Sequence, residues 1–291
     1  MGYLTKLTEH CTWAKLYINN LKNSVMTDIY ENAANDFLEL ASEQRLNIIF
    51  KLLEKKSKIS SMAKELHATV QEVHRNFERL ANAGLIMKDK DGMYDLTTYG
   101  KTMCTQVPSL LFLSKNRKYF ENHDFGDVPM KFIQRIGALA GGQQVKGFVK
   151  VLEQWKTIYK NADEFVYEIF TEVPLDLIEP LLTRVKKGIK LNYIFAESVI
   201  VPKGRRELLE KLGIKDLINK GLVERKMRAG TNVVVILNEK EACVGFPTLD
   251  GTADMREMFY SKDSLFHEWC LDYFRYCWYN AQSFQESKIH E

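Results

Sequence analysis

The chain has 291 residues, of which 45% are hydrophobic and 27% are charged. This mix is typical of a folded globular protein and excludes a disordered chain. The formal net charge is only +3, which excludes a general basic field of the kind that histones carry, so any contact with nucleic acid must be local. The length fits one large domain or two smaller ones.

Signals for export, membranes and cofactors are weak throughout the sequence. Apolar runs such as 233–237 are far shorter than the ~18 residues that a membrane span needs, and residues 1–6 have neither a signal-peptide pattern nor a myristoylation pattern. The five cysteines form no CxxC pair, which is typical of a reduced compartment. Zinc spacings and nucleotide-binding loops are also missing from the sequence. We therefore expect a cytoplasmic protein with no membrane contact, no metal and no cofactor.

Residues 1–37 are expected to form an N-terminal helix. Apolar residues recur there at alternating spacings of three and four, the a/d seam of a heptad repeat, at Leu4, Leu7, Cys11, Ala14, Ile18, Leu21 and Val25. The seam breaks at Asp28. Such a narrow stripe needs a partner, which is either the same helix of a second chain in a homodimer or the helix's own domain.

Residues 38–107 predict three helices followed by a two-stranded hairpin. Ser42 is a good N-cap for the first helix, and the second helix is short, at about 60–66. The third starts at a capping box formed by Thr69 and Glu72 and ends at Gly84. An Asp-Gly turn then joins two short strands. This order predicts a winged helix-turn-helix domain, with apolar helix faces formed by Leu46, Ile49, Phe50, Leu53, Val70, Val73, Phe77 and Leu80.

The third predicted helix, residues 69–83, has the side chains needed to read DNA. Gln, Asn and Arg can hydrogen-bond base edges bidentately, and the N-terminal half of a recognition helix enters the major groove. The five lysines of residues 51–64 outnumber the single glutamate there by four. This local positive charge favours DNA as the partner, and a solvated basic face without a partner is the alternative interpretation. The candidate DNA-binding residues are Thr69, Gln71, His74, Arg75, Asn76, Arg79, Lys58, Lys64, Lys88 and Lys90, with Arg79 expected on phosphate.

The remaining chain predicts connecting helices at 108–146, including one at 131–139, and an α/β domain at 147–291. Strands and helices alternate in that domain, which indicates a partly parallel, mixed sheet. The expected strands are 164–171, 189–195, 217–227, 232–237 and 241–246, and the expected helices are 148–159, 175–187, 206–212 and 265–283. The chain as a whole is thus expected to be α/β in class, with a mainly helical N-terminal domain.

Several phrases of the sequence resemble a known family. Residues 80–86 and 96–100 resemble winged-helix regulators of archaea and bacteria, and residues 123–137 and 266–278 resemble archaeal transcription factors of the methanogenesis-regulator type. The resemblance covers about residues 38–280. It implies a DNA-binding winged helix followed by a middle domain of unknown ligand, which is similar in strand order to half of a phospholipase D fold.

The phospholipase D resemblance implies phosphodiester chemistry only if the catalytic motif is kept. That motif needs a histidine nucleophile with a lysine two residues later. None of the six histidines has a lysine at that position. We therefore expect a domain that does not catalyse a reaction and instead senses an effector or forms a dimer.

The polar residues between 197 and 206 are best interpreted as an ordinary basic loop, and a site for a small anionic effector is the alternative. Ligands of α/β sheets lie beyond the carboxyl ends of strands, and helix N-termini suit anions. The candidate residues are Glu197, Lys203, Arg205 and Arg206.

The combined hypothesis is a homodimeric transcription regulator that binds double-stranded DNA and a possible small-molecule effector, and is not an enzyme. The alternatives are a divergent phosphodiesterase or nuclease tethered to DNA, and a winged-helix module that binds a protein.

Overall fold

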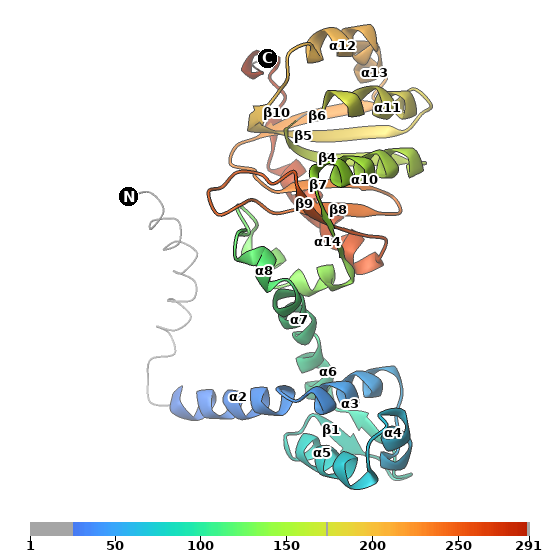
Figure 1. Cartoon of the computed structure of the whole chain (residues 1–291), viewed down its shortest axis with the longest axis vertical. Coiled ribbons are helices and arrows are strands. Elements are labelled where there is room, and N and C mark those ends of the chain that lie inside the picture. The colour runs from blue at the N-terminus through green and yellow to red at the C-terminus, as the bar shows by residue number, and fades with distance from the viewer. Residues whose placement is uncertain (1–25, 173, 290–291) are drawn as a thin grey trace. The chain divides into compact units, whose positions relative to one another are not determined.

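The computed structural model describes residues 26–172 and 174–289 (Figure 1). The heptad seam expected at residues 4–25 lies outside the described residues. The chain divides after Thr105 into two compact units. Among the described residues, no helix is both long enough and apolar enough to cross a membrane.

The first unit contains helices and one hairpin in the order expected of a winged helix-turn-helix domain. The elements are α2 (Met26–Leu40), α3 (Glu43–Glu54), α4 (Ile59–Glu65), α5 (Val70–Asn82), β1 (Ile86–Lys88), β2 (Tyr94–Leu96) and α6 (Thr98–Cys104). After α2, the three helices α3, α4 and α5 are followed by an antiparallel hairpin, here called the wing, whose strands pair with Ile86 opposite Leu96.

The predicted caps position α3 and α5 as the sequence indicated. Ser42 accepts a hydrogen bond from the backbone of Arg45. At the start of α5, the Glu72 amide donates to the Thr69 hydroxyl (3.2 Å) and the Thr69 amide donates to the Glu72 carboxylate (3.0 Å). These bonds satisfy amides that have no partner within the helix, and they confirm the capping box.

One side of α5 is fully buried in the core of the first unit. Val73, Phe77 and Leu80 have no exposed surface and pack with α3 and the wing. Two members of the predicted apolar faces lie on the surface instead, because they stand at helix ends beyond the core. Val70 in the first turn of α5 is 55% exposed, and Leu53 in the last turn of α3 is 44% exposed.

The base of the wing is joined closely to the end of α5. The Thr97 hydroxyl donates to the Gly84 carbonyl (2.6 Å) and the Thr97 amide donates to the Leu85 carbonyl (3.0 Å). Gly100 lies so close that an added Cβ would stand 2.0 Å from the Leu85 oxygen. The sequence segments 80–86 and 96–100 therefore pack against each other at the base of the wing.

The second unit is built on an eight-stranded mixed sheet of order β10-β6-β5-β4-β7-β8-β9-β3. The pairs β4–β5 and β5–β6 are parallel, and the other pairs are antiparallel, so the predicted α/β class with a mixed sheet is confirmed. The strands are β3 (Gln143–Lys146), β4 (Phe165–Glu172), β5 (Lys190–Ile200), β6 (Val223–Arg228), β7 (Val234–Asn238), β8 (Ala242–Gly245), β9 (Glu257–Ser261) and β10 (Gln282–Ser283).

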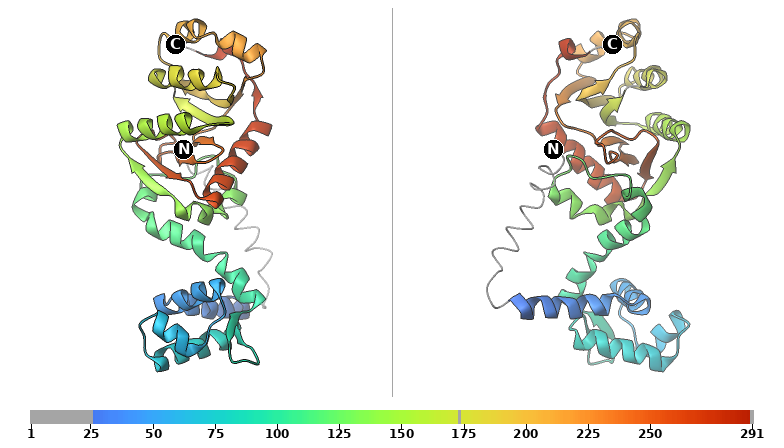
Figure 2. Two further views of the ribbon diagram at one scale, coloured as in Figure 1. Left: turned by 90° about the vertical axis from the view of Figure 1, so that its right-hand side faces the viewer. Right: turned by 60° about the vertical axis from the view of Figure 1, so that its left-hand side comes forward.

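Helices cover both faces of this sheet and create two apolar cores (Figure 2). On one face lie α10 (Phe148–Asn161), α11 (Leu175–Val185), α12 (Arg205–Lys211) and α13 (Ile214–Asn219). The other face is covered by α7 (Val107–Lys115), α8 (Arg117–Phe120), α9 (Met130–Ile133), the 3-10 helix η1 (Ile136–Gly141) and α14 (Ser264–Tyr279). Residues 107–141, expected to connect two domains, thus contribute directly to this second core.

Several predicted elements of the second unit were wrong in extent or type. The helix expected at 131–139 is split into α9 and η1. The strand expected at 217–227 is α13 followed by β6, because Gly221 adopts a left-handed turn (φ +68°) between them. Strands β3, β9 and β10 were not predicted. Strand β3 lies at the edge of the sheet, is half-exposed and pairs with β9. Because β3 and β9 are only four and five residues long, neither has the long apolar run that marks a buried strand in a sequence.

Candidate nucleic-acid interface and buried cavity

The N-terminal half of α5 presents polar side chains to solvent. Gln71, His74 and Arg75 are exposed on the side opposite the buried stripe. Gln71 and Arg75 form no hydrogen bond with another described side chain, and the His74 ring lies 3.5 Å from the Glu78 carboxylate one turn further along. These three predicted contacts are therefore available to an incoming ligand.

Asn76 and Arg79, also predicted to contact DNA, are engaged within the first unit. The Asn76 amide donates to the side chain of Gln44 on α3. Arg79 donates to both carboxylate oxygens of Glu39 on α2, and this bond holds the pKa of Glu39 below its usual value. The sequence did not indicate these partners because Gln44 lies 32 residues before Asn76 and Glu39 lies 40 residues before Arg79.

The lysines of the first unit fall into two groups. Lys51 and Lys55 lie within 3.3 Å of Glu65, and Lys56 lies 3.6 Å from both Asp89 and Asp95. These ion pairs remove most of the local charge expected at residues 51–64. The second group is exposed and forms no ion pair with a described residue; it consists of the four predicted DNA contacts Lys58, Lys64, Lys88 and Lys90, and of Lys101. The Lys88 ammonium lies 5.7 Å from the Tyr94 ring centre.

The four residues predicted to bind an anion do not form one site. Glu197 lies within β5 and not after it, since the strand continues to Ile200, and it pairs with Lys288 at 2.9 Å. Lys203 and Arg206 are exposed. Arg205 alone points inward, with only 2% of its surface exposed.

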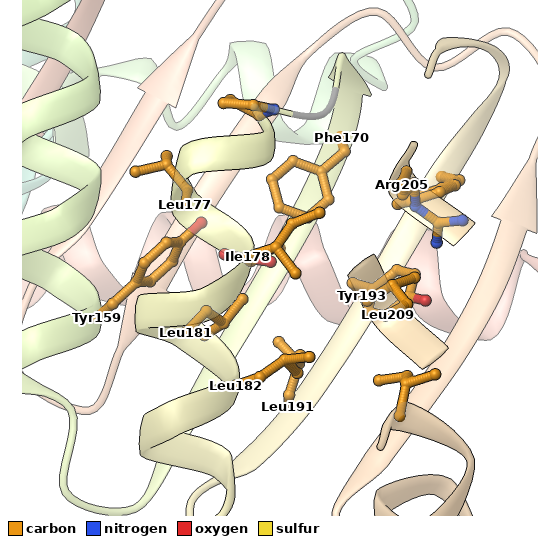
Figure 3. Close-up of a pocket in the computed structure, with 14 residues that line it drawn as sticks. Tyr159, Phe170, Leu177, Ile178, Leu181, Leu182, Leu191, Tyr193, Arg205 and Leu209 are labelled. Atoms are coloured by element: carbon orange, nitrogen blue, oxygen red, sulfur yellow. The ribbon is translucent and has the colours of Figure 1, made fainter. Parts of the chain in front are cut away.

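Arg205 borders a cavity of about 50 Å³ beneath α11 (Figure 3). Helices α10 to α13 and strands β4 and β5 enclose it, and most of the lining is Leu, Ile and Phe. Four lining residues have polar groups, namely Tyr159, Glu168, Tyr193 and Arg205. The cavity therefore combines apolar walls with a few polar groups, the composition typical of small-molecule sites.

The polar groups of the cavity are buried and incompletely paired. One terminal guanidinium nitrogen of Arg205 has no hydrogen-bond partner among the described residues, nor has either carboxyl oxygen of Glu168. The same Arg205 nitrogen stands 3.7 Å from Glu286, and the guanidinium lies 5.1 Å from the Phe195 ring centre. Buried polar groups are rarely left unpaired, so the Arg205 nitrogen offers a hydrogen bond that the described residues do not use.

Burial raises the pKa of Glu168 to about 8, and its interaction with Tyr159 only partly opposes this effect. A carboxyl group without exposed surface is costly to ionise, so Glu168 is mainly uncharged at neutral pH. Sequence reasoning missed this residue. Its one signal is an acid in the middle of the otherwise apolar run Val166–Phe170.

The described histidines of the second unit act as structural links. The His123 ring is nearly buried, with Nδ1 2.7 Å from the Tyr119 carbonyl and Nε2 2.9 Å from the Asp254 carboxylate. The His267 Nε2 is 2.6 Å from the Asn238 carbonyl. Within the described part of the chain, no three His, Cys, Asp or Glu residues are grouped so that they could hold a metal ion.

No protein-family model and no curated protein matches the chain. Among solved structures, the chain is similar to TrmBL2, an archaeal chromatin protein whose structure shows a novel mode of DNA binding, with 13% identity over 84% of this chain and 94% of that chain (TM-score 0.39). It is similar to NucT from Helicobacter pylori, with 12% identity over 49% of this chain and 98% of that chain (TM-score 0.38). It is also similar to Nuc from Salmonella typhimurium, a phospholipase D family member, with 12% identity over 50% of this chain and 98% of that chain (TM-score 0.36).

Proposed function

We propose that this protein is a transcription regulator that binds double-stranded DNA sequence-specifically through α5. The observation that carries the proposal is the two-sided character of this helix. Val73, Phe77 and Leu80 fix one side in the core, while Gln71, His74 and Arg75 are free on the other. A rigid helix that presents Gln and Arg at its N-terminal half suits base-edge recognition in the major groove.

The unpaired lysines supply the phosphate contacts in this proposal. Lys58 immediately precedes α4 and Lys64 lies within it. Lys88 and Lys90 lie on the wing. All four are exposed. Phosphate contacts from such residues fix the orientation of a protein on DNA without reading its sequence.

The proposed regulator is a homodimer that recognises a two-fold symmetric site. Helix α2 supports this part, because Tyr30, Phe37 and Leu38 are each more than half exposed on it. Their spacings of seven and eight residues place them on one helix face. An exposed apolar face of this kind marks an interaction surface, and a second copy of the chain would present the same face in a closed, symmetric pair.

The second unit is proposed to be a non-catalytic effector domain of a cytoplasmic protein. The missing His-Lys pair and the structural contacts of His123 and His267 support a role without phosphodiester chemistry. The cavity beneath α11 supports a role in ligand binding.

Selection from a random duplex pool, followed by affinity measurements on the enriched sequence, tests the function. We expect wild-type protein to enrich one sequence class and the folded double variant H74A/R75A to lose at least tenfold in affinity for it. The matched control is Asn82→Ala, at the exposed end of α5. Equal affinities of the wild type and the double variant would contradict the proposal.

A further inference from the structure

We propose that the cavity beneath α11 binds a small apolar carboxylic acid, with the ligand carboxylate on Arg205 and its hydrocarbon body against the leucines of α11. This inference rests on the effector role proposed for the second unit, and it names the ligand class and the site. The residues involved come from four helices and two strands of one compact unit.

Arg205 gives the site its preference for an anion. Two cations, Arg205 and Arg225, share the single carboxylate of Glu286, at 3.7 and 2.7 Å, so this end of the cavity has one uncompensated positive charge. Glu286 is about half exposed and lies closer to Arg225 than to Arg205, so it compensates mainly the charge of Arg225. A buried guanidinium nitrogen without a hydrogen-bond partner can donate a charge-assisted hydrogen bond to a carboxylate oxygen.

Apolar side chains fill the space between the polar groups. Figure 3 shows Tyr159 and Arg205 on opposite sides of the cavity, with Ile178 and Leu182 of α11 between them. The volume of about 50 Å³ has room for roughly three to five atoms of water size. The site thus favours an acid of about two or three carbons over a longer one.

The protonation of Glu168 explains why the cavity should prefer an acid to an amine. The carboxyl is fully buried and mainly protonated at neutral pH, so it adds no negative charge to repel an anion and can donate a hydrogen bond. The other groups around it are Tyr159 from α10, Cys243 from β8, Tyr193 from β5 and Arg205 from α12. Burial raises the pKa of both tyrosines and of the cysteine, so Arg205 is the charged group among the described residues that line the cavity.

The test uses the full chain and propanoate as the probe, with propan-1-ol and propan-1-amine as neutral and cationic analogues of the same chain length. We expect isothermal titration at pH 7 to detect the acid and to show at least tenfold weaker binding of the alcohol and the amine. Arg205→Gln should lose at least tenfold in affinity for the acid. The adjacent, exposed Arg206→Gln is the matched control and should retain it.

Two further variants keep the test decisive if Arg205→Gln does not fold. Ile178→Phe places extra volume at the edge of the cavity and should abolish binding of the acid in a folded protein. Leu209→Phe fills the cavity from α12 and should have the same effect. Preferential binding of the amine that Glu168→Gln abolishes would overturn the proposal, and so would binding of none of the acids of two to four carbons.

DNA affinity is measured separately without any acid, so failure of the proposed function and failure of the ligand site are distinguishable. If the protein binds DNA but no acid, only the site is wrong. If it binds the acid but no DNA, only the proposed function is wrong.

Discussion

Arg79 donates to both carboxylate oxygens of Glu39, at 2.6 and 2.9 Å, and so joins the second half of α5 to the end of α2. Glu39 also lies 3.1 Å from Arg45 on α3, which makes it the common partner of two helices. The only arginine of α5 outside this network is Arg75, in the N-terminal half. The ion pair therefore divides α5 into a half that stabilises the first unit and a half that is free to bind.

This division predicts different effects for the two arginines of α5. Arg75→Ala should weaken binding to the selected sequence by ten- to a hundredfold and relax the base preference at one position, because a bidentate base contact contributes ~1–3 kcal/mol. Arg79→Ala should change DNA affinity by less than threefold. Fluorescence anisotropy with the selected duplex measures both values, and a larger loss for Arg79→Ala would show that the assignment is reversed.

The two groups of lysines should differ in the salt dependence of DNA binding. Each lost phosphate contact reduces the slope of log affinity against log salt by about one, so Lys58→Ala and Lys88→Ala should each lower the slope by that amount. Lys55→Ala should leave the slope unchanged, because Lys55 is paired with Glu65. Titrations at four salt concentrations give the slopes, and equal changes in all three variants would contradict the grouping.

Gly100→Ala should destabilise the first unit without touching the DNA-binding face. The new methyl group would stand 2.0 Å from the Leu85 carbonyl oxygen, and overpacking of this kind costs about 1–3 kcal/mol. Thermal unfolding of the variant should occur at a lower temperature than that of the exposed neighbour variant Thr98→Ala. An unchanged unfolding temperature for Gly100→Ala would mean that the wing and α5 are not packed as described.

Glu168 should make the second unit less stable at alkaline pH. Its pKa is raised from 4.5 to about 8 in the folded state, so between these values the folded state binds more protons than the unfolded state. Stability from this group is complete below about pH 4.5 and is lost as pH rises through 8, by an amount on the order of 5 kcal/mol. Glu168→Gln should remove this part of the pH dependence.

Urea unfolding followed by the fluorescence of the buried Trp155 and Trp269 measures the effect of Glu168. As the pH is raised from 6 to 9, the urea concentration at the midpoint should decrease for the wild type relative to Glu168→Gln. Parallel midpoints over that range would show that Glu168 is already ionised or is solvated in the folded protein.

Local signals made the first unit predictable from its sequence. The capping box at Thr69, the turn at Gly84 and the spacing of Val73, Phe77 and Leu80 each act within a few residues, and all of them have the expected geometry. The partners of Arg79 and Asn76 come from other helices, and no spacing rule connects them. The outward face of α5 was thus visible in the sequence, but its division into bound and free halves was not.

The second unit was less predictable because its sheet joins distant segments. Strand β3 pairs with β9 more than 100 residues away, and short edge strands lack a distinctive apolar pattern. The anion site was expected at a loop with Lys203 and Arg206, whereas only Arg205 points inward. Glu168, the second buried polar group of the cavity, lies about 37 residues before Arg205 in the sequence, so only the packing of β4 against α11 and α12 relates them.

The most direct test of the account is selection from a random duplex pool with the purified full chain at two salt concentrations. The account predicts that one two-fold symmetric sequence is enriched, that binding weakens steeply with salt, and that H74A/R75A abolishes the enrichment. Enrichment by the double variant of the same sequence with the same affinity would contradict α5 as the reading element. Absence of any salt-dependent duplex binding would contradict DNA recognition itself and favour a protein partner for the first unit.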